Sequence, residues 1–136
     1  MSIFSYPADK ALAFVLPFPK GNVYITNGYQ GSETHQRKSK FSLDFRSYQE
    51  KDPCLSYGAP VLAIDSGQVS FLRQANKDKK KGYGTHILVK TQDGKMMWYA
   101  HMIKESISVK GPTDKDKNIV GDFVQKGQIL GLMGDT

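Results

Sequence analysis

Cysteine is almost absent from this sequence. It occurs once in the 136 residues, at Cys54. A single cysteine cannot form an intramolecular disulfide, and it cannot supply the clustered thiolates of a cysteine-based zinc site. A nucleophilic role would require a histidine partner that the position of Cys54 does not identify. An inert thiol is therefore the favoured interpretation.

Long apolar runs are also absent. No segment approaches the roughly 20 apolar residues that a membrane-spanning helix requires. The apolar stretch 11–18 is short, and Pro17 and Pro19 interrupt it. It has neither a basic leading segment nor a small-residue cleavage site, so we identify no signal peptide in this chain. We expect no membrane span, and an exported protein would already have lost its signal.

The charge is predominantly of one sign. Nineteen Lys and Arg residues against 13 Asp and Glu residues give a net charge of +6. This excess favours an anionic partner, such as nucleic acid, a membrane surface or an acidic cell-wall polymer. Two local clusters, 37–40 and 77–81, carry much of it. Neither cluster is interleaved with the aromatic residues that single-strand binders use, so we expect solvated loops and no nucleic-acid partner.

Helical periodicity is missing as well, and short strand patterns take its place. Turn signals separate these patterns, and Asp93-Gly94 is a strong hairpin signal. A second hairpin-like signal, at 65–67, is expected to join two neighbouring strands. The expected strands are 23–26, 41–45, 59–64, 68–72, 85–90 and 95–101, with a short helix or turn in 102–109 and a compact turn plus strand in 120–131. This pattern predicts one all-β domain over 1–136, with antiparallel sheets arranged as a sandwich or barrel-like structure.

Candidate chemistry centres on three histidines, because no P-loop, dinucleotide fingerprint or nucleophile elbow occurs. His86 lies inside a predicted strand, where a packed or surface role is the favoured interpretation. His101 ends the strand 95–101, whose alternation puts it on the same face as Met97 and Tyr99. His35 lies in a polar loop before Asp44. Imidazole and carboxylate groups can both ligate zinc, although their spacing alone does not establish a site.

Four blocks, in order, resemble the lysostaphin-type zinc metallopeptidases, enzymes that cut peptide cross-links of bacterial peptidoglycan. The first block is His35 followed by Leu43-Asp44-Phe45, and the second spans 58–69. The third runs from Gly82-Tyr83-Gly84 through Trp98-Tyr99-Ala100-His101, and the fourth from 120 to Gly134-Asp135-Thr136. The order of the four blocks is far more specific than any one of them.

The resemblance implies an all-β fold of the duplicated hybrid motif type and a zinc cofactor. By position, His35 and Asp44 would be zinc ligands. His101 would be a catalytic histidine that orients the attacking water or stabilises the tetrahedral intermediate. The implied partners are peptidoglycan peptides. The implied location is extracellular or periplasmic, at the cell envelope, and the oligomeric state stays open.

Two departures from the family pattern affect the expected activity. The gap between His35 and Asp44 is longer than the commonest family spacing, as in a subset of such domains. The family's His-x-His element, which supplies the third zinc ligand, normally follows the block ending at Thr136, and no histidine follows His101 here. We therefore expect a domain that is incomplete at its C-terminus and inactive as this chain.

Two other functions stay open at this point. The first is a non-catalytic binding or regulatory domain of the same fold, acting on the cell wall or on a hydrolase partner. The second is a swivelling carrier or phosphotransfer domain. Its characteristic turn is similar to 124–131, and one histidine would be the phosphoacceptor.

Overall fold

The computed structural model describes residues 57–75 and 82–134 fully, and the backbone of residues 22–27 and 44–48. Several sequence-based expectations lie outside these ranges. They concern His35, Cys54, the apolar stretch 11–18 and the basic clusters 37–40 and 77–81.

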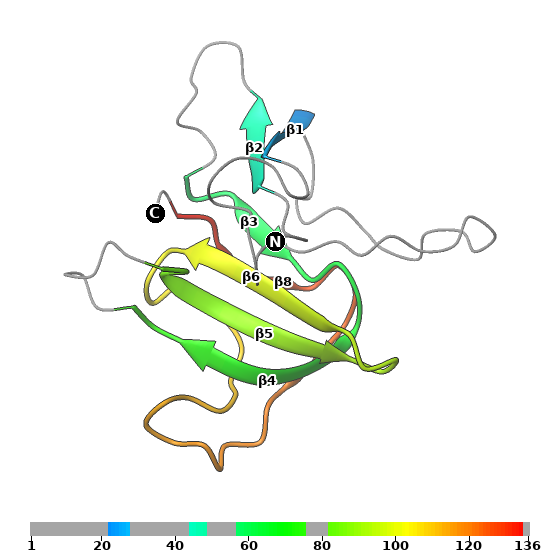
Figure 1. The fold of residues 1–136 in the computed structure, drawn as a ribbon, viewed down its shortest axis with the longest axis vertical. Coiled ribbons are helices and arrows are strands. Elements are labelled where there is room, and N and C mark those ends of the chain that lie inside the picture. Colours follow the sequence, from blue (N-terminus) through cyan, green and yellow to red (C-terminus); the bar gives the residue numbers. More distant parts are fainter. Residues whose placement is uncertain (1–21, 28–43, 49–56, 76–81, 135–136) are drawn as a thin grey trace.

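Eight strands and no helix make up the described part of the chain (Figure 1). They are β1 (Asn22–Asn27), β2 (Asp44–Tyr48), β3 (Pro60–Leu62), β4 (Gly67–Arg73), β5 (Thr85–Thr91), β6 (Met96–Met102), β7 (Phe123–Val124) and β8 (Ile129–Leu132). The all-β prediction is confirmed. Residues 102–109, where a helix or turn was expected, contain a turn at Lys104 and Glu105.

All strand pairs are antiparallel, as predicted. β1 pairs with β2, β3 pairs with β8, and a four-stranded sheet has the order β6-β5-β4-β7. In the first pair, Asp44 opposes Asn27. The strand expected to end at residue 45 continues to Tyr48, into sequence that was expected to be a loop.

The segment that follows β8 connects the small β3–β8 sheet to the large one. Met133 forms an isolated antiparallel bridge with Met102, at the end of β6. On its other side, the Met133 amide donates to the Ala59 carbonyl at 2.8 Å, just before β3. The Ile103 amide also donates to the Leu132 carbonyl at 2.9 Å. The two sheets therefore meet along β8, and the sheets do not close into a barrel.

The β5–β6 hairpin forms where Asp93-Gly94 predicted it. Gly94 has a φ of 84°, in the left-handed region that glycine adopts without strain. The Thr91 hydroxyl accepts a hydrogen bond from the Lys95 amide at 3.0 Å, and the Thr91 amide donates to the Lys95 carbonyl at 2.9 Å. The glycine conformation and the hydrogen bonds of Thr91 both favour the same tight turn, and this turn sets the register of the two long strands.

The second predicted hairpin, at 65–67, is wrong. β3 pairs with β8, whereas β4 pairs with β5 and β7. Ala63 and Ile64, which are consecutive, are both buried, so the chain turns a corner in the core there instead of continuing a strand. The Ala63 backbone is also already bonded on both sides, to the Gln128 carbonyl at 2.8 Å and to the Gly127 amide at 2.7 Å.

The outer edge of β4 is covered by the loop that leads to β7. The Leu72 amide donates to the Pro112 carbonyl at 2.8 Å, and the Val69 amide donates to the Asp122 carbonyl at 2.9 Å. Gly121 passes so close to this edge that a Cβ there would collide with the Val69 carbonyl. An unpaired strand edge is a template for aggregation, and this loop prevents that by accepting hydrogen bonds from the edge amides of β4.

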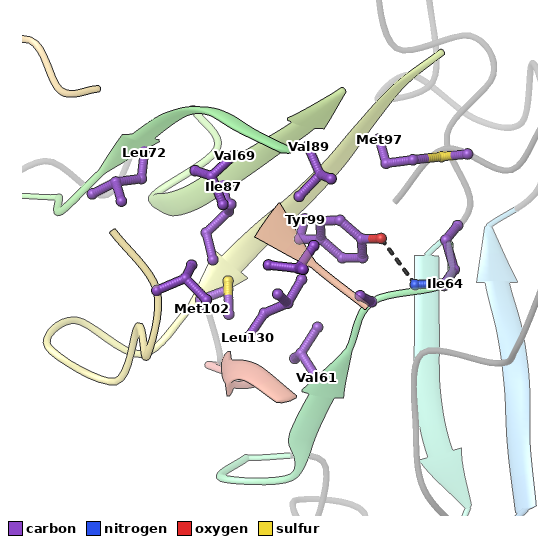
Figure 2. Packing of buried hydrophobic residues seen from close by; sticks show 13 residues of the cluster. Val61, Ile64, Val69, Leu72, Ile87, Val89, Met97, Tyr99, Met102 and Leu130 are labelled. Atoms are coloured by element: carbon purple, nitrogen blue, oxygen red, sulfur yellow. Dashed lines mark hydrogen bonds between the residues drawn. The ribbon is translucent and has the colours of Figure 1, made fainter. Parts of the chain in front are cut away.

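The core lies between the four-stranded sheet and the β3–β8 pair, and Tyr99 is its largest fully buried side chain (Figure 2). The Tyr99 hydroxyl points to the corner after β3 and accepts a buried hydrogen bond from the Ile64 amide at 3.0 Å. Burial raises the pKa of Tyr99 well above its ordinary value, so the hydroxyl stays protonated. One side chain thus joins β6 to the β3 corner.

We expect Tyr99→Phe to destabilise the fold by about 1–3 kcal/mol, because the buried Ile64 amide would lose the acceptor that the Tyr99 hydroxyl supplies. Urea unfolding followed by circular dichroism measures this change. Tyr57→Phe, at an exposed position, is the matched control and should leave the midpoint in place. Equal midpoints for Tyr99→Phe and the unmodified chain would contradict the assigned bond.

Candidate active site

His101 lies in a β-bulge near the end of β6. Thr85 pairs with Met102 and Ile87 pairs with Tyr99, so His86 alone opposes both Ala100 and His101. The extra residue on β6 has a φ of 59°, in the left-handed region. Bulges of this kind re-aim side chains and occur often beside active sites.

The bulge corrects the expected alternation of β6. Met97 and Tyr99 are buried on the core face, as predicted, but His101 is exposed. Met102 takes the core position that regular alternation would have given to His101. The imidazole therefore belongs to the surface of the molecule, while its immediate neighbours along the strand anchor the backbone in the core.

Hydrogen bonds hold the His101 backbone on both sides. Its amide donates to the Tyr83 carbonyl at 3.0 Å, and its carbonyl accepts from the Gly134 amide at 2.8 Å. Gly134 is required at this contact, since a Cβ there would lie 2.9 Å from the His101 oxygen. His101 is thus held by the loop before β5 and by the segment after β8.

The left-handed backbone at His101 is costly. A residue with a Cβ in this region loses about 1–2 kcal/mol relative to its preferred conformations. Such strain persists only where the surrounding structure enforces it, and it concentrates at functional sites. The backbone outlier, the exposed imidazole and the two-sided bonding together make His101 the strongest candidate for chemistry among the described residues.

His86 has a packing role, as predicted. Its side chain is 7% exposed, and Nδ1 lies 2.8 Å from the Gly84 carbonyl oxygen. Since a carbonyl oxygen only accepts, Nδ1 carries the proton in this bond. The ring packs against Phe71 at 5.9 Å and Trp98 at 5.7 Å between centroids.

Sequence reasoning missed the role of Tyr83. Its ring contacts Trp98 at 4.3 Å and His86 at 6.2 Å between centroids, and its carbonyl bonds the His101 amide. The available signal was Gly82-Tyr83-Gly84, an aromatic residue between two glycines. That triplet opens the third block of the family resemblance, which gives Tyr83 no role of its own.

The side chains of the predicted zinc ligands lie outside the described part of the structure. His35 lies outside the described residues, and Asp44 is described only as the first backbone position of β2. Within the described ranges, no group of three or more His, Cys, Asp or Glu side chains could hold a metal. A complete zinc site would therefore need ligands from outside those ranges. Those same ranges contain no helix suited to crossing a bilayer.

Comparison with known families gives a match over more than half of the chain. The family model described as "Peptidase family M23" matches residues 52–136, which include His101, Tyr83 and Gly134. His35 and Asp44 precede the matched range. Neither a search of curated proteins nor a search of solved structures returned a match.

We expect His101→Gly to be more stable than His101→Ala by about 1 kcal/mol, because glycine adopts the left-handed region without the Cβ penalty. Both variants lose the imidazole, so its contacts cancel in the comparison. Chemical denaturation measures the difference.

The controls for this comparison lie nearby. Glu105, with a φ of 65°, should show the same order of glycine over alanine. Ala100→Gly, at a neighbouring position without a positive φ, should instead lose stability. A His101→Ala variant as stable as His101→Gly would show that the bulge carries no strain.

Proposed function

Because this chain belongs to peptidase family M23, we propose that it is a zinc-dependent endopeptidase domain acting on the peptide cross-links of bacterial peptidoglycan. In this proposal His101 is the catalytic histidine, and His35 and Asp44 are zinc ligands. The observation that carries the proposal is the backbone of His101. It is in the left-handed region and hydrogen-bonded on both sides, and it presents the side chain at the surface.

Zinc, when bound, would polarise the scissile carbonyl and make its bound water more acidic. An imidazole can act as a general acid or base or bind a developing oxyanion, and in this proposal His101 supplies it. The rigid support of His101 favours this role, since misplacing a catalytic group by about 1 Å can cost 10²-fold in rate.

The net charge of +6 supports an anionic cell-wall substrate. We therefore propose that the protein acts at the cell envelope, in an extracellular or periplasmic location. The M23 match covers the turn at 124–131, so it favours a peptidase-type domain over the carrier or phosphotransfer alternative.

A second candidate function is binding of wall peptides, or of a hydrolase partner, without cleavage. The observation that favours it is the donor set: residues 1–136 contain three histidines, one of which, His86, is packed among aromatic rings. The proposed His35–Asp44 pair gives two of the three protein ligands that a catalytic zinc usually takes. Zinc titration and peptide hydrolysis, measured on the same preparation, distinguish the two functions.

We expect His35→Ala and Asp44→Ala each to weaken zinc binding at least tenfold, because each removes one of two proposed ligands. Competition with a fluorescent chelator measures the affinity. His86→Ala is the matched histidine control and should keep the affinity of the unmodified chain. Unchanged affinity in both ligand variants, or an equal loss in His86→Ala, would refute the ligand assignment.

We expect His101→Ala to retain zinc and to lose peptide hydrolysis by about 10²–10⁴-fold, the usual contribution of a positioned acid or base. The assay uses cross-linked peptidoglycan peptides and the protein with whatever natural sequence follows Thr136 in place. Normal cleavage by His101→Ala would make His101 structural. Cross-link binding without cleavage by the unmodified protein would favour the binding function.

A further inference from the structure

We propose that Tyr83 is the positioning residue for His101, and that it acts through an outer aromatic cluster formed by Phe71, Tyr83, His86 and Trp98. This inference rests on the proposed function only for the catalytic importance of His101. The chain of contacts itself runs from the cluster to the Tyr83 carbonyl, and from there to the backbone that carries the imidazole.

The first link is the hydrogen bond between the two backbones. Regular pairing of β5 with β6 is interrupted between Thr85 and Ile87, where the bulge that carries His101 lies. The Tyr83 carbonyl, which precedes β5, accepts that amide at 3.0 Å. The position of this carbonyl therefore helps to set the direction in which the bulge presents His101.

The second link concerns what holds Tyr83 in place. Its two neighbours, Gly82 and Gly84, have φ values of 88° and 58°, and glycine gives the backbone little intrinsic stiffness. The Tyr83 ring, by contrast, packs against Trp98 at 4.3 Å between centroids with planes 39° apart. The Tyr83 and His86 rings also meet in an edge-to-face arrangement, with centroids 6.2 Å apart and planes at 72°. We infer that the ring contacts supply the order that the two glycines lack.

The third link fixes the other end of the loop. His86 donates from Nδ1 to the Gly84 carbonyl at 2.8 Å, one residue after Tyr83. His86 is also the single residue of β5 that faces the bulge on β6. The same imidazole thus holds the loop backbone, contacts the Tyr83 ring and lies opposite Ala100 and His101.

Trp98 acts in this arrangement through its ring face. Its Nε1 is buried and has no hydrogen-bond partner among the described residues, although a buried indole N–H usually finds one. Contact of the large ring with Tyr83 and His86 is what the structure shows there.

Amide hydrogen exchange, measured by NMR for single residues, tests the inference without any need for activity. Tyr83→Ala should speed exchange of the His101 amide at least tenfold, while the amides of Leu88 and Val89 in the central strand β5 stay within twofold. Tyr83→Phe, which keeps the ring, should leave all three unchanged. An unchanged His101 amide in Tyr83→Ala, or equal acceleration at all three amides, would overturn the inference.

Trp98→Leu provides the second variant, should Tyr83→Ala not fold. It removes the ring against which Tyr83 packs, and the same selective acceleration at His101 is expected. A uniform change, or none at His101, counts against the inference in the same way.

Hydrolysis of cross-linked peptides then separates this inference from the proposed function. Tyr83→Ala should lower kcat at least tenfold with KM unchanged, and Tyr83→Phe should restore it. If His101→Ala cleaves normally, the catalytic assignment fails even where the exchange result holds. If cleavage needs His101 but Tyr83→Ala keeps both its kcat and its His101 protection, only the positioning role fails.

Discussion

The structure depends on a constraint in β6: Tyr99 and Met102, three positions apart, must both face the core. A regular strand places residues at odd separations on opposite faces, so the two cannot both be buried without an extra residue between them. The chain inserts that residue as a bulge, and His101 takes the left-handed backbone that the bulge requires. Burial of two large side chains thereby enforces an unfavourable conformation at an exposed histidine.

The remaining elements support this arrangement from two directions. Tyr99 is tied to the β3 corner through the Ile64 amide, and Met102 is bridged to Met133, so both sides of the bulge are anchored to the β3–β8 region. The Gly134 amide then donates to the His101 carbonyl, and a Cβ at Gly134 would lie too close to that carbonyl oxygen. Strain at one residue is stable here because the surrounding contacts are large, buried and independent of it. That combination is what a fixed catalytic side chain requires.

The sequence predicted the features that local chemistry decides. Strand periodicity gave the all-β class, Asp93-Gly94 gave the β5–β6 hairpin, and the ordered blocks gave the family. The sequence did not predict the bulge, because the alternation of inward and outward side chains through Met97 and Tyr99 extends to His101 without a break in the sequence pattern. It also paired β3 with β4 wrongly, because the burial of both Ala63 and Ile64 is a tertiary fact with no local signal. The His35 and Asp44 assignments remain predictions, since the described residues do not include their side chains.

The most direct test of the role of His101 is a crystal structure of the protein in zinc, with anomalous data collected at the zinc edge. We predict an anomalous peak between His35 and Asp44, with the His101 imidazole facing it from the bulge. A peak at a different location would contradict the assignment of His35 and Asp44 as ligands. An imidazole turned away from the metal would contradict the assignment of His101 as the catalytic residue.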